Sequence, residues 1–81
     1  MADRYLDILS KPESDQEYIA RTTSNSSLLD ILSNSESVLV KMAVLSNPNI
    51  SFETLNRVID DENETVWRRA QELMDSRKKL A

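Results

Sequence analysis

The chain has 81 residues, 40% of them hydrophobic and 30% charged, and its formal net charge is −4. This composition is typical of a folded domain with a thin core. Cysteine, histidine and glycine are absent, which excludes disulfides, thiol or imidazole catalysis and glycine-rich phosphate loops. We therefore expect a single non-catalytic domain over residues 1–81, without a cofactor or a bound metal.

Charge and hydropathy give two further expectations. Residues 1–64 carry 12 acidic and 5 basic side chains, a net −7, whereas residues 65–81 carry 2 acidic and 5 basic, a net +3. The start of the chain lacks a basic region followed by an apolar run, and no segment has the roughly 18 apolar residues of a membrane span. We expect a cytoplasmic protein that does not interact with a membrane.

A segment of the sequence recurs. Residues 6–14 read LDILSKPES and residues 29–37 read LDILSNSES, so seven of nine letters agree at an offset of 23. A third copy follows, at a best offset of 27, with 26 as the alternative register. Such copies predict stacked supersecondary units, here over about residues 3–23, 26–46 and 50–80.

Each unit is predicted to contain two short helices, because apolar residues recur at spacings of three and four. The expected helices, in chain order, lie near residues 3–10, 14–22, 27–33, 36–46, 52–59 and 63–79. Leu32, Ala43 and Ile59 are expected in the core. The prediction is an all-α fold, a short right-handed α-solenoid of about three helical hairpins.

Polar residues before these helices predict their N-caps. Ser14 with Glu17, and Asp61 with Glu64, have the spacing of a capping box. Ser51 is expected to cap the helix over 52–59. Ile50 and Leu55 beside this cap have the spacing of a hydrophobic staple.

The segment NPNISFETLNRVIDDENETVWRRA resembles the leucine-rich repeat variant, a bacterial family related to HEAT and armadillo repeats. The matching positions are Asn47, Pro48, Asn49, Leu55, Val58, Ile59, Asp61 and Val66. Trp67 stands where the family usually has arginine, Arg68 follows one residue late, and Ser51 replaces a proline. The resemblance implies a right-handed stack of helical pairs, some with first helices distorted towards 3₁₀, which binds other macromolecules. The family's cysteine-rich iron–sulfur segment is absent, so no redox role is implied.

Two charged segments suggest sharper functions. Residues 60–64, DDENE, offer oxygen ligands for calcium but lack the glycine and the spaced glutamate of an EF-hand, so helix capping is favoured. Basic residues in 68–79 suggest phosphate contacts. However, the acidic remainder would repel a polyanion, and Glu64–Arg68 and Asp75–Lys79 have the spacing of ordinary ion pairs on a helix surface. Nucleic-acid binding is not favoured.

Trp67 has two interpretations. It either covers the edge of the thin core or serves, with Arg68, as an exposed anchor for a partner, since tryptophan and arginine are enriched at binding hot spots. The favoured function is a small adaptor or regulator that binds another protein. The alternative is an acidic inhibitor that blocks a nucleic-acid-binding site on an enzyme. An apolar end of the stack also suggests a homodimer.

Overall fold

The computed structural model describes residues 6–80 and contains five α-helices, one 3₁₀ helix and no strand in that range. The elements are η2 (Leu6–Ser10), α1 (Glu13–Thr22), α2 (Ser26–Leu32), α3 (Val38–Ser46), α4 (Phe52–Val58) and α5 (Glu64–Leu80). The five α-helices lie within about two residues of their predicted positions, and η2 ends at the predicted residue, Ser10. The all-α prediction is confirmed for these residues, and the predicted start of the first helix, at residues 3–5, lies outside them.

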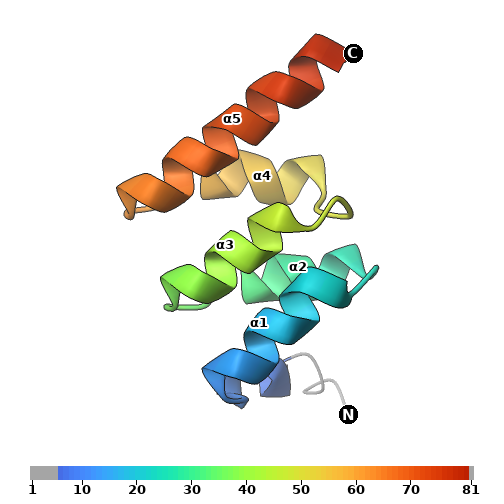
Figure 1. The fold of residues 1–81 in the computed structure, drawn as a ribbon, viewed down its shortest axis with the longest axis vertical. Helices are drawn as coiled ribbons and strands as arrows, with labels where there is room; N and C mark the ends of the chain where they lie inside the picture. Colours follow the sequence, from blue (N-terminus) through green and yellow to red (C-terminus); the bar gives the residue numbers. More distant parts are fainter. Residues whose placement is uncertain (1–5, 81) are drawn as a thin grey trace.

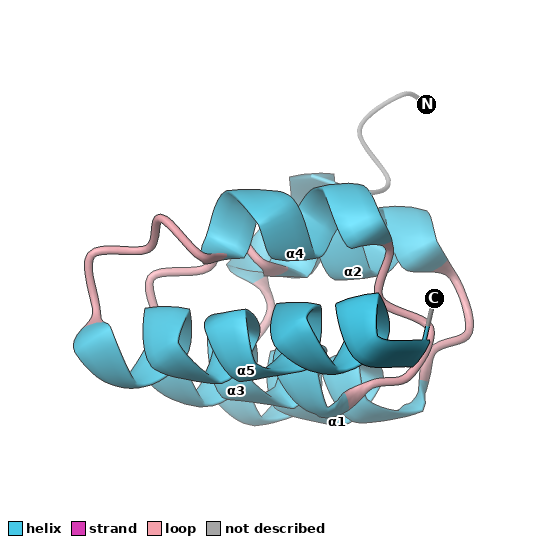
Figure 2. Ribbon diagram, turned by 90° about the horizontal axis from the view of Figure 1, so that it is seen from above, coloured by secondary structure: helices cyan, strands magenta, loops and turns pink. Residues whose placement is uncertain are grey.

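The helices form two layers (Figures 1 and 2). Helices α1, α3 and α5 run side by side in one layer, and η2, α2 and α4 form the other. Helix α3 packs against both α1 and α5, while α2 packs against α1, α3 and η2. We name the successive elements the first pair (η2 and α1), the second pair (α2 and α3) and the third pair (α4 and α5).

The core lies between the two layers. Leu29, Leu32, Val40, Leu55 and Val66 are fully buried there, so both layers contribute. Helix α3 occupies the middle of its layer, and it contains only two polar residues among nine. This composition fits a helix with neighbours on three sides.

The predicted core is confirmed at Leu32 and Ala43, which are buried. It is wrong in degree at Ile59, which is only partly buried against the core. Ile59 is the C-cap of α4, beyond the last residue that faces inward. Ile59 therefore lies at the end of α4 and not on the side of the helix that faces the core.

The N-cap predictions are confirmed at one helix and wrong at two. The Ser51 hydroxyl accepts from the Thr54 N–H at 3.1 Å, as expected. Helix α1 instead begins after Pro12, at an extended ψ of 150°, so Ser14 lies inside the first turn. At α5 the cap is Asn63, whose side chain accepts from Val66 N, because Asp61 is bonded to Lys41 and to Asn63 N.

Equivalent caps determine the register between the second and third pairs. Asn25 and Ser51 cap α2 and α4, and Ser37 caps α3 as Asn63 caps α5. Both relationships have an offset of 26. The fully buried Leu29 corresponds to the fully buried Leu55 at the same offset. The favoured offset of 27 is therefore wrong, because it would match half-buried Leu28 with Leu55.

Polar contacts connect the successive pairs at their edges. The Asn47 carboxamide donates to the carbonyls of Ala20 and Thr23 at 2.9 and 2.7 Å. The Arg77 guanidinium donates to the Ile50 carbonyl at 2.6 Å. Each contact brings a side chain back to a carbonyl of the preceding pair or of the connection that follows it, where a helix end or loop leaves the carbonyl without an intrahelical partner.

Candidate partner-binding surface

The structure places Trp67 and Arg68 in the first turns of α5. Trp67 keeps 37% of its surface exposed, and the Arg68 guanidinium lies 5.8 Å from the centroid of its ring, within cation–π range. Arg68 also forms an ion pair with Glu64, four residues earlier on the helix. The two predicted site residues are therefore brought together on an exposed turn.

Trp67 has counterparts in the other pairs. Gln16, Lys41 and Trp67 each lie four residues after the N-cap of their helix. Gln16 is buried, and its carboxamide donates to the Leu9 and Lys11 carbonyls. Lys41 is covered by the connection that follows α4, where its ammonium lies 2.7 Å from Asp61. Within residues 6–80 no element follows α5, and Trp67 remains half-exposed.

Helix α4 contributes three further residues to this end of the molecule. Thr54 and Arg57 face α2, as their bonds to Asp30 show, and Leu55 and Val58 face the core. The remaining side carries Phe52, Asn56 and the C-cap Ile59. Phe52 is 53% exposed. We name Phe52, Asn56, Ile59 and Trp67 the end surface, because they belong to α4, its C-cap and α5. Figure 1 shows these two helices at one end of the molecule.

The interface between the second and third pairs is charged. The Asp30 carboxylate accepts from the Thr54 hydroxyl at 2.7 Å and from the Arg57 guanidinium at 2.8 Å. Arg57 also donates to the Ser33 hydroxyl at 2.7 Å. With the Lys41–Asp61 ion pair, these contacts match each buried or half-buried charge with an opposite one.

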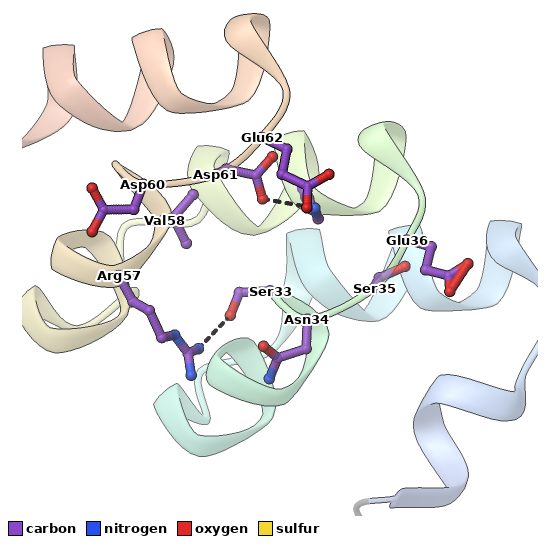
Figure 3. Close-up of a pocket in the computed structure, with 10 residues that line it drawn as sticks. Ser33, Asn34, Ser35, Glu36, Arg57, Val58, Asp60, Asp61 and Glu62 are labelled. Carbon is purple, nitrogen blue, oxygen red and sulfur yellow. Dashed lines mark hydrogen bonds and ion pairs between the residues drawn. The ribbon is translucent and has the colours of Figure 1, made fainter.

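A second candidate surface is a groove of about 640 Å³ between the α2–α3 and α4–α5 connections (Figure 3). Its two cations are already bonded, Arg57 to Asp30 and Lys41 to Asp61. In Figure 3 the Asp60 and Glu36 carboxylates point away from the Arg57–Ser33 hydrogen bond. The cations that line the groove are therefore already paired, and the carboxylates on its rim face outward.

Three of residues 60–64 perform structural roles. Asp61 bonds Lys41, Asn63 caps α5, and Glu64 pairs with Arg68. Over residues 6–80, no group of three or more acidic side chains is placed to hold a metal ion. None of the described helices is both long and apolar enough to cross a membrane.

No protein-family model, curated protein or solved structure matches this chain. The resemblance to the leucine-rich repeat variant therefore stays a prediction. The site rests on the geometry of the described residues alone.

The sequence predicted Trp67 and Arg68 as site residues, did not point to Phe52 or Asn56, and placed Ile59 in the core. The information that would have revealed these residues is the offset of 26 between the second and third pairs. At an offset of 26, Asn56 and Ile59 correspond to Asp30 and Ser33, which bind the next pair. The change in residue type at these positions marks the end surface.

Proposed function

We propose that this chain is a non-catalytic adaptor or regulator, built as a short right-handed α-solenoid of three helical pairs, which binds another protein. The observation that carries the proposal is the half-exposed Trp67, with the Arg68 guanidinium 5.8 Å from the centroid of its ring. Large aromatic and arginine side chains at a partly exposed site are typical of binding hot spots.

The rest of the end surface supports this function. Phe52 adds a second exposed aromatic ring, and Asn56 and Ile59 carry no charge. A patch with an uncharged centre and a charged neighbour such as Arg68 has the composition of a protein interface, whose centre is depleted of charge.

Affinity capture from the native cell, followed by mass spectrometry, tests the proposal. The parent chain should retain a specific protein that Trp67→Ala loses, a loss of roughly 2 kcal/mol or more at a hot spot. Tyr18→Ala is the matched control, because Tyr18 is an exposed aromatic residue on α1, away from the end surface. A protein that Trp67→Ala captures as well as the parent would contradict this assignment of the site.

An acidic inhibitor of a nucleic-acid-binding enzyme is the second candidate. The outward-facing carboxylates of Glu36 and Asp60 favour it, as does the net −7 of residues 1–64. Such carboxylates suit long-range attraction of a basic surface. Glu36→Gln with Asp60→Asn should then reduce the association rate, whereas an adaptor that uses Trp67 should be insensitive to both changes.

A further inference from the structure

The interface between the second and third pairs shows how one helical pair of this chain packs against the next. The second pair presents Asp30, Ser33 and Lys41, one near the end of α2, one at its C-cap and one on α3. The third pair brings Arg57 and Asp61 against them, at 2.7–2.8 Å. Thr54 also contacts the second pair, because its hydroxyl donates to the Asp30 carboxylate at 2.7 Å.

The third pair presents a surface with the same backbone form. Helices α2 and α4 each have seven residues, and their C-caps have nearly equal dihedral angles, φ −65° and ψ −13° at Ser33 and φ −63° and ψ −13° at Ile59. At the offset of 26 that the caps determine, the equivalents of Asp30, Ser33 and Lys41 are Asn56, Ile59 and Trp67. The shape is retained, while the charges are lost.

We propose that the end surface binds a two-helix segment of another protein, which docks as the third pair docks on the second and has uncharged residues in place of Arg57 and Asp61. This inference rests on the proposed adaptor function and specifies the class of partner. A segment with those charges would bury them against Ile59 and Trp67, without the counter-ions that Asp30 and Lys41 provide. The end surface therefore selects an uncharged helical pair and rejects a charged one.

A second copy of the chain is a poor occupant for this surface. The complementary face is the side of a pair that carries Thr54 and Arg57. In a second copy, the third pair has this face covered by α2. The second pair is covered in turn by the first, through the contacts of α1 with α3 and of η2 with α2. The first pair lies at the opposite end of the described helices (Figure 1), but it begins with a five-residue 3₁₀ helix in place of the seven-residue α-helix with which the third pair docks. Another protein with a free face of this kind fits better.

The test uses the full chain with an appended probe. A copy of residues 47–80 is joined after residue 81 through a glycine–serine linker of about 15 residues, which reaches roughly 22 Å. The charged probe keeps Arg57 and Asp61 in the appended copy, and the uncharged probe carries Arg57→Leu and Asp61→Ala there. Amide hydrogen exchange of the appended segment reports docking, because an undocked pair of short helices is marginally stable.

We expect the uncharged probe to dock and its amides to exchange at least about 30-fold more slowly than those of the charged probe, the ratio for one unpaired buried charge. Asn56→Asp, Ile59→Ser and Trp67→Lys in the parent recreate the charged set of the second pair. This variant should reverse the preference, so that the charged probe becomes the protected one.

Fast exchange of the uncharged probe on the parent, or equal protection of both probes, would overturn the proposal. Sedimentation must show a monomer throughout, since concentration-dependent dimers would identify a second copy as the occupant and also overturn it. The adaptor function is decided separately, by capture with the parent and Trp67→Ala. A parent that captures a partner but rejects the uncharged probe retains the function and loses only this inference.

Discussion

The Lys41 ammonium lies 2.7 Å from the Asp61 carboxylate, and the two side chains are only 18% and 12% exposed. This pair joins α3 to the connection between α4 and α5. The aromatic ring of Trp67 occupies the position on α5 that Lys41 has on α3. At equivalent positions, Lys41 thus forms an ion pair that joins the second and third helical pairs, whereas Trp67 presents an exposed ring on the last pair.

A double-mutant cycle on Lys41→Met and Asp61→Asn should show coupling of about 1–2 kcal/mol, because the pair is largely removed from water. Urea unfolding of the four proteins provides the measurement. The exposed pair Arg21–Glu17 is the control, and its coupling should stay below about 0.5 kcal/mol. Equal coupling in both cycles would mean that burial adds nothing to the Lys41–Asp61 interaction.

Leu32→Ala should lower the free energy of unfolding by about 2–4 kcal/mol, since the side chain is fully buried between the layers. That is a large share of the stability of so small a domain. Leu39→Ala, at a position 57% exposed, should change stability little. An unchanged melting temperature for Leu32→Ala would contradict the assignment of the core.

Asn47→Ala should cost about 1–3 kcal/mol, because it leaves the Ala20 and Thr23 carbonyls without their donor in a buried place. Thermal unfolding followed by circular dichroism measures this change. Asn49, whose side chain is exposed, is the matched control. If both alanine variants melt together, the contact between α1 and the end of α3 does not stabilise the fold.

Trp67→Ala should cost roughly 1–2 kcal/mol, less than the 3–5 kcal/mol typical of a fully buried tryptophan, because the ring is 37% exposed. Thermal unfolding separates this stability effect from the loss of partner capture. A variant that is unfolded at room temperature would identify Trp67 as a core residue. The partner site would then have to be sought on the acidic side of the stack.

Salt dependence distinguishes the two candidate functions. Binding through the uncharged end surface should change little between low and high ionic strength, whereas binding through Glu36 and Asp60 should weaken steeply. Isothermal titration with the captured partner at about 0.05 and 0.5 M salt provides the comparison. A steep loss of affinity at high salt would favour the acidic inhibitor.

The sequence by itself determined the helical class and the positions of the helices, because these depend on local spacing. Apolar residues three and four apart predicted each of the five α-helices to within about two residues, and Ser51 was identified as a cap from its immediate neighbours. Each of these features involves residues within one or two turns of each other.

Only the tertiary structure decided the register, the cap of α5 and the end surface, because each depends on residues 20–27 positions apart. Asp61 does not cap α5, since Lys41 binds it from another helix. The offset of 26 emerged from burial and from matched caps, and it placed Ile59 at the end of the stack. A periodic pattern tolerates a shift of one residue, whereas the charge pairing between packed helices does not.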